Sequence, residues 1–188
     1  MPMTSVPTSP NLLSRLRGFG RAEGGMAAVE FAVILPFMLT AYLGGVEIGD
    51  GVAIDRKVAI TTRAVADLAS RYPKINDAQM TTILGAASTI IAPYASGPLA
   101  VTISGVTVDS RGIATIDWSN TLNGTARSKG SSVTLPGTLN SPNAYYVWGE
   151  VKYAYTPTLG YVMTGTWNLT NQIFMSPRES ATIVRTPT

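Results

Sequence analysis

The feature that most constrains this chain is the apolar run of residues 26–46, which contains a single charge. It reads MAAVEFAVILPFMLTAYLGGV, and Glu30 is its only charged residue. At ~1.5 Å per residue, a helix of this length crosses the hydrocarbon core of a membrane. A carboxylate inside lipid is costly and is usually kept for a function. We therefore expect a transmembrane helix with one functional acid, kinked at Pro36, which removes one backbone hydrogen bond.

Residues 1–25 form a basic leader before this run. Its arginines, Arg15, Arg17 and Arg21, directly precede the apolar segment. Positive residues beside a membrane segment stay in the cytoplasm, so the N-terminus is predicted inside and everything after residue 46 outside. Two other interpretations stay open at this point. One is a secretory signal peptide, which lacks its Ala-x-Ala site here, and the other is a plain signal anchor with Glu30 near the interface.

The helix is predicted to continue beyond the membrane, over residues 47–72. At 100° per residue one side of it is apolar and the opposite side carries charges. Tyr72 precedes Pro73, and a residue before proline avoids the helical region, so the helix should end there. The apolar stripe, expected to dock a globular domain, comprises Ile54, Val58, Thr61, Val65, Leu68 and Tyr72.

Residues 73–188 are predicted to form an α+β domain with a second short helix and an antiparallel sheet of about four strands. Asn76 and Gln79 have the spacing of a capping box, and Pro93 closes the helix that they begin. Alternating apolar residues predict a hairpin over 99–119 with a bulge at Gly105, then an aromatic strand over 144–155 and a last strand over 166–176. Residues 119–143 are predicted to be a long surface loop, and the tail after Pro177 carries little signal.

The net charge of +3 does not indicate a nucleic-acid partner, because most of it lies in the leader. Residues 1–25 hold three arginines and one glutamate, or +2, which leaves +1 for the rest of the chain. There is no His and no Cys, which excludes Cys/His zinc sites, thiol chemistry and His-dependent catalysis. We expect no metal, no cofactor and no enzymatic activity. The enzyme alternative is a tethered carboxylate-dependent hydrolase that uses Asp117 and Glu150, although nothing in the sequence brings these two together.

The segment from Arg21 to Pro36, RAEGGMAAVEFAVILP, closely resembles the N-terminal signature of TadE-like pseudopilins, minor subunits of the Tad (Flp) branch of type IV pili. The family pattern is a glycine, four small or apolar residues, then glutamate and an aromatic residue. Gly25, the four residues from Met26 to Val29, Glu30 and Phe31 occupy it without a gap. Residues 108–119 and 174–178 are similar to the hairpin and the C-terminal ending of these proteins.

The resemblance implies that a prepilin peptidase cuts after Gly25, so that Met26 becomes the new N-terminus. The α-amino group of Met26 would then be charged below a pKa of roughly 8. Glu30 of one subunit can pair with the Met26 ammonium of a neighbour, which favours assembly and fixes register. The implied partners are other Tad pilins and pseudopilins and the inner-membrane assembly platform. A membrane-anchored periplasmic scaffold without a pilus role is the main alternative.

Overall fold

The computed structural model describes residues 23–157, 160 and 164–187. The predicted leader, residues 1–25, lies almost entirely outside this range. The described elements follow the order α2, β1, α3, β2, β3, β4, η1, β5, β6 and β7. The chain forms two compact units, one up to Val46 and one from Glu47 onward, and each is described by itself.

Helix α2, Glu23–Ser70, supplies the described part of the first unit and opens the second. The prediction placed this helix over residues 26–72, so its observed ends differ by three and two residues. It continues through Pro36, although the missing proline N–H leaves the Ala32 carbonyl without its usual partner. The kink predicted at Pro36 stays a prediction.

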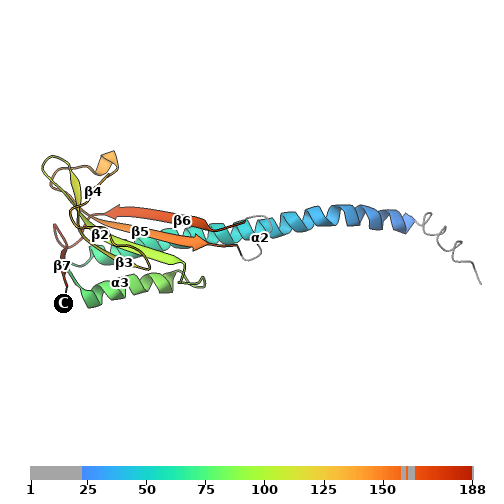
Figure 1. Ribbon diagram of the computed structural model, residues 1–188, viewed down its shortest axis with the longest axis horizontal. Coiled ribbons are helices and arrows are strands. Elements are labelled where there is room, and N and C mark those ends of the chain that lie inside the picture. Colours follow the sequence, from blue (N-terminus) through green and yellow to red (C-terminus); the bar gives the residue numbers. More distant parts are fainter. Residues whose placement is uncertain (1–22, 158–159, 161–163, 188) are drawn as a thin grey trace, which may run out of the picture. The chain divides into compact units, whose positions relative to one another are not determined.

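The second unit contains an antiparallel five-stranded sheet in the order β4-β3-β2-β5-β6 (Figure 1). Its four long strands are β2, Leu99–Val108; β3, Ala114–Leu122; β5, Tyr145–Tyr155; and β6, Trp167–Met175. The register between β2 and β3 shifts between Gly105 and Val106, which confirms the predicted bulge. The α+β fold class is confirmed, and the fifth strand is the two-residue β4, Ser132–Val133.

Helix α3, Asp77–Ile90, begins as the sequence predicts. The Asn76 side chain accepts a hydrogen bond from the Gln79 backbone N–H at 2.8 Å, and the Gln79 side chain accepts one from the Asn76 N–H at 2.9 Å. This capping box satisfies two helix donors that would otherwise lack partners. The buried side of α3 carries Met80, Ile83, Leu84 and Ala87, which follow one another at helical spacing.

The main core lies between one face of the sheet and the two helices, α3 and the later part of α2. The predicted stripe of α2 is confirmed, since Ile54, Val58 and Val65 are buried in it. The buried side is wider than predicted, because Ala66 is also covered. A Cβ placed on Gly149 of β5 would come within 3.0 Å of the Ala66 Cβ, so the helix and this strand approach closely at that point.

A second, smaller core covers part of the opposite face of the sheet. Residues of β2, β3 and β5 form it together with Leu135 and Leu139, which come from the segment predicted as a long loop. The prediction of a loop over residues 119–143 was therefore wrong in part. This segment includes the end of β3, the strand β4 and the 3-10 helix η1, Gly137–Leu139. Leu135 and Leu139 stand four apart among polar residues, which is why the pattern did not indicate strand or helix.

The C-terminal tail is also structured, although its residue pattern predicted neither helix nor strand. Strand β7, Val184–Thr186, pairs in parallel with β1, Lys74–Asn76. Ile183 is fully buried, and its carbonyl accepts hydrogen bonds from the Trp118 Nε1–H at 3.0 Å and the Tyr145 hydroxyl at 3.0 Å. A single isoleucine followed by a three-residue strand is too short a pattern to be detected by periodicity.

Candidate membrane helix and processing site

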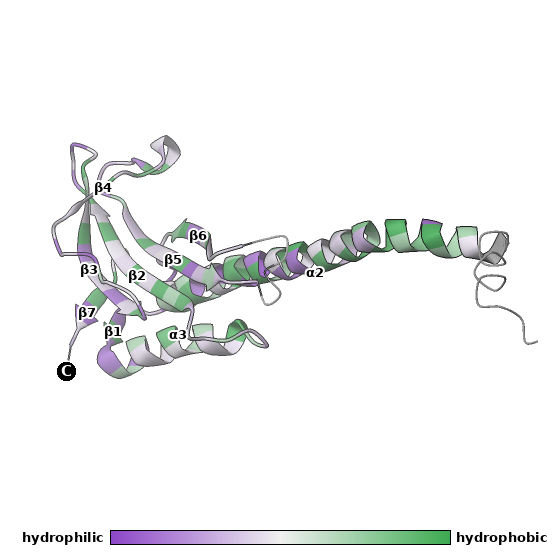
Figure 2. Ribbon diagram, turned by 45° about the vertical axis from the view of Figure 1, so that its right-hand side comes forward, coloured by the Kyte–Doolittle hydropathy of each residue, from purple (hydrophilic) through white to green (hydrophobic). Residues whose placement is uncertain are grey.

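The first half of α2 has the surface of a membrane helix. Figure 2 shows hydrophobic residues along this part of α2. Its apolar side chains are exposed on every side, with Phe37 74% and Met26 69% exposed. Among the described residues, this is the one helix long and apolar enough to cross a membrane. A helix that is apolar all round and uncovered by protein fits a lipid environment.

The predicted site residues all lie on this exposed helix. Gly25 is partly exposed, and Met26, Glu30, Phe31 and Pro36 are exposed. Met26 and Glu30 are four residues apart and so lie on one side of the helix. Side chains in a helix lean toward its N-terminus, so the Glu30 carboxylate leans toward the Met26 end. If the chain began at Met26, Glu30 would stand close to the positive end of the helix dipole.

This placement does not by itself test the roles assigned to these residues. The cut between Gly25 and Met26, the assembly role of Glu30 and Phe31, and the kink at Pro36 all stay predictions. The peptide bond between Gly25 and Met26 lies within a helix, since α2 begins at Glu23. A peptidase that cuts there must bind the segment in an opened form, because proteases act on extended backbone.

The two carboxylates of the hydrolase alternative are held in separate ion pairs. Glu150 is bound by Arg127, with 2.6 Å between Arg127 Nη2 and Glu150 Oε1. Asp117 pairs with Lys129 at 3.2 Å between Nζ and Oδ1. Strand β2 lies between the strands that carry them, and the register aligns Glu150 with Thr102, not with Asp117. The structure therefore does not bring the two acids together.

Sequence reasoning missed two polar arrangements within the second unit. One is the buried trio of Trp118, Tyr145 and the Ile183 carbonyl, in which burial raises the pKa of the Tyr145 phenol. The other is the Arg127–Glu150 pair, in which the hydrogen bond to Glu150 raises the pKa of the Arg127 guanidinium. The partners in each are 23 or more residues apart in the chain, so no local motif could reveal them.

These features define a class, that of single-span membrane-anchored α+β proteins. The sequence comparison adds a likeness over part of the chain: the family model of TadE-like proteins matches residues 25–67, which include Gly25, Glu30 and most of the buried stripe of α2. The resemblance is thereby confirmed for this segment, and it supports a Tad pilus-associated protein. No curated protein and no solved structure matches the chain significantly.

Proposed function

We propose that the chain is a non-catalytic pseudopilin that takes part in assembling or priming a Tad pilus. Residues 26–46 anchor it in the bacterial inner membrane, with the leader in the cytoplasm and the α+β domain in the periplasm. The observation that carries the proposal is a lone acid, Glu30, on an exposed apolar helix five residues after Gly25, within the segment that matches the TadE-like family. The pilus would serve adhesion or secretion.

The mechanism is one of helix packing. Cutting after Gly25 creates a charged amine at Met26 beside the Glu30 carboxylate of a neighbouring subunit. Each charge alone is costly in lipid, whereas the pair is partly neutralised. Pairing therefore favours assembly over isolated subunits and sets how far one helix is displaced along the next.

Processing is the direct test of this proposal. Protein purified from membranes of cells that contain a prepilin peptidase is expected to begin at Met26, as measured by intact mass. Gly25→Ala is expected to retain the leader, because the peptidase site requires the glycine. Gly24→Ala is the matched control and is expected to be cut normally. An intact leader on the wild-type chain in such cells would overturn the pseudopilin role and favour the scaffold alternative.

Glu30→Ala is expected to insert and be cut normally but to assemble poorly. Breaking a buried ion pair costs roughly 3–5 kcal/mol, so pilus number should fall by about tenfold or more. Because the chain has no cysteine, Val33→Cys on the exposed helix gives a unique site for cross-linking to neighbouring subunits. Glu30→Asp keeps the charge and should retain part of the assembly. Normal pilus number and normal cross-linking in Glu30→Ala would contradict the pairing mechanism.

A further inference from the structure

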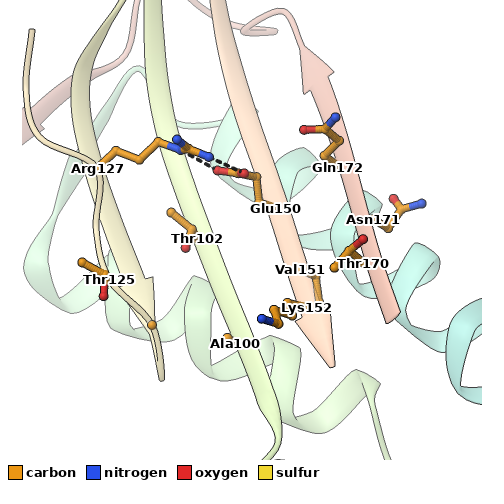
Figure 3. A pocket seen from close by; sticks show the side chains of 11 residues that line it. Ala100, Thr102, Thr125, Arg127, Glu150, Val151, Lys152, Thr170, Asn171 and Gln172 are labelled. Carbon is orange, nitrogen blue, oxygen red and sulfur yellow. Dashed lines mark hydrogen bonds and ion pairs between the residues drawn. The ribbon is translucent and has the colours of Figure 1, made fainter. Parts of the chain in front are cut away.

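The face of the sheet opposite the main core carries a polar groove that the proposed pilus role does not explain. Its volume is about 660 Å³, which is within the range of sites for small ligands. It lies on the sheet face opposite the main core, because its residues Thr102, Glu150 and Lys152 alternate with buried residues of that core. The segment containing Thr125 and Arg127, which follows β3, forms one wall (Figure 3).

The floor of the groove is an ordered grid of side chains on three adjacent strands. The register aligns Thr102, Glu150 and Gln172 in one row across β2, β5 and β6. The next row in the register consists of Ala100, Lys152 and Thr170. Because these residues stand on paired strands, their backbone positions are fixed relative to one another.

Arg127 is held rigidly at one end of the groove. It extends from the wall across β2 to Glu150 (Figure 3), with 2.8 Å from Nε to Oε2 and 2.6 Å from Nη2 to Oε1. Its guanidinium carbon lies 4.0 Å from the centre of the Trp148 ring. Its backbone N–H donates to the Ser119 hydroxyl at 3.1 Å. The fixed guanidinium keeps N–H donors that the two bonds to Glu150 do not use.

Two neutral groups in the floor are oriented as well. The Thr121 hydroxyl donates its one proton to the Val101 carbonyl, so the Thr102 hydroxyl must be the donor in the 3.1 Å contact between the two threonines. Thr102 therefore offers only acceptor lone pairs to the groove. The Gln172 amide oxygen accepts from the Trp148 Nε1–H at 3.3 Å, which leaves the amide nitrogen as a donor.

The charges of the groove leave one cation unmatched. Arg127 and Lys152 are cations and Glu150 is the carboxylate that lines it, so the lining has a net charge of +1. Arg127 neutralises Glu150, whereas Lys152 is exposed and has no ion-pair partner in the described part of the chain. Among the described residues that line the groove there is no aromatic ring, and the neighbouring Trp148 is buried against Arg127 and Phe174.

From this combination we infer that the groove binds an acidic glycan, a sugar chain that contains uronic acid units. Sugar hydroxyls both donate and accept, which matches the acceptor on Thr102 and the donors on Arg127 and Gln172. The carboxylate of the sugar pairs with Lys152. The polar floor argues against an apolar ligand.

Calorimetry with the full-length chain in detergent micelles and trigalacturonic acid as the probe tests this inference. We expect saturable 1:1 binding, weakened about tenfold when the probe is fully methyl-esterified, because the esters keep the hydroxyls but remove the charge. Lys152→Gln should weaken binding of the acid by the same factor and leave binding of the ester unchanged. Lys74→Gln removes an exposed charge on β1, away from the groove, and should change the affinity for neither the acid nor the ester.

Three results would overturn the inference: no binding of the acid, equal binding of acid and ester, or equally effective competition by inorganic phosphate, which would indicate a plain anion site. A further variant, Thr102→Val, should weaken binding of the acid and of the ester equally, because it removes the hydroxyl that acts as a fixed acceptor. The assay measures binding by the purified chain, so its failure would leave the proposed processing and pilus role untouched.

Discussion

A chain that ends after Thr182 is expected to lose the cooperative fold of the domain. The truncation removes Ile183, whose full burial stabilises the fold by roughly 2–3 kcal/mol. It also removes the carbonyl to which Trp118 Nε1–H and the Tyr145 hydroxyl donate. Trp118 keeps the Tyr145 oxygen as an acceptor, whereas the Tyr145 hydroxyl loses this acceptor, and a buried donor without a partner costs about 1–3 kcal/mol.

The truncation also releases Arg185, which ties the tail to the rest of the domain. Its guanidinium donates to the Asn120 side chain at 2.9 Å and to the Ile75 carbonyl at 3.0 Å, and it pairs with Asp77. Together these losses approach the whole stability of an ordinary domain, about 5–15 kcal/mol. Tryptophan fluorescence during urea unfolding should show no cooperative transition.

Two further variants make this prediction specific. A chain that ends after Thr186 keeps β7 and should unfold like the full chain. Ile183→Ala keeps the carbonyl and the strand, and should lower the free energy of unfolding by about 2–4 kcal/mol. If the chain ending after Thr182 unfolds with the same midpoint as the full chain, the role assigned to the tail is wrong.

The second large effect is expected for Gly105→Ala, which adds one methyl group inside the core. A Cβ at this position would lie 2.2 Å from the Tyr145 hydroxyl oxygen and 2.5 Å from Trp118 Nε1. Real Cβ atoms do not approach other atoms this closely, so both rings must move. These rings hydrogen-bond to each other at 2.8 Å and to Ile183, so moving them breaks a buried network. We expect the free energy of unfolding to fall by about 3 kcal/mol or more.

Gly85→Ala is the matched control, because it adds the same methyl group where no atom lies within 4 Å. Gly85 is inside α3, where alanine favours the helix by roughly 0.5–1 kcal/mol. In chemical unfolding, the free energy of unfolding should therefore fall for Gly105→Ala and rise for Gly85→Ala, each relative to the wild type. A Gly105→Ala protein as stable as the wild type would show that the ring network is not constrained as described.

The elements with strong local patterns could be predicted from the sequence. The capping box at Asn76, the α2 stripe at Val58 and Val65, the bulge at Gly105 and the aromatic β5 each follow from spacing over a few residues. Alternation along the strand also accounts for the two faces of β5, with Tyr145 in the main core and Trp148 on the other side.

The remaining parts depend on contacts between distant segments, which periodicity does not encode. Ile183 is buried in the main core, and its carbonyl accepts hydrogen bonds from Trp118 and Tyr145, 65 and 38 residues away. Leu135 and Leu139 lie in a polar segment and become core only when that segment folds over the sheet. The TadE-like motif could be recognised because it is contiguous, and its role as a processing site stays a prediction. The groove around Arg127, in contrast, required three strands and a loop to be placed together.

The parallel pairing of β1 with β7 has a consequence for the order of folding. Ile75 pairs with Arg185, so the first and last strands of the domain are joined across nearly its whole length. The domain cannot close until its final residues are available. In a chain exported behind an N-terminal anchor, as we propose here, the domain would complete its fold only after β7 has crossed the membrane. A polypeptide that stays open for that time remains thin enough to be threaded through a translocation channel.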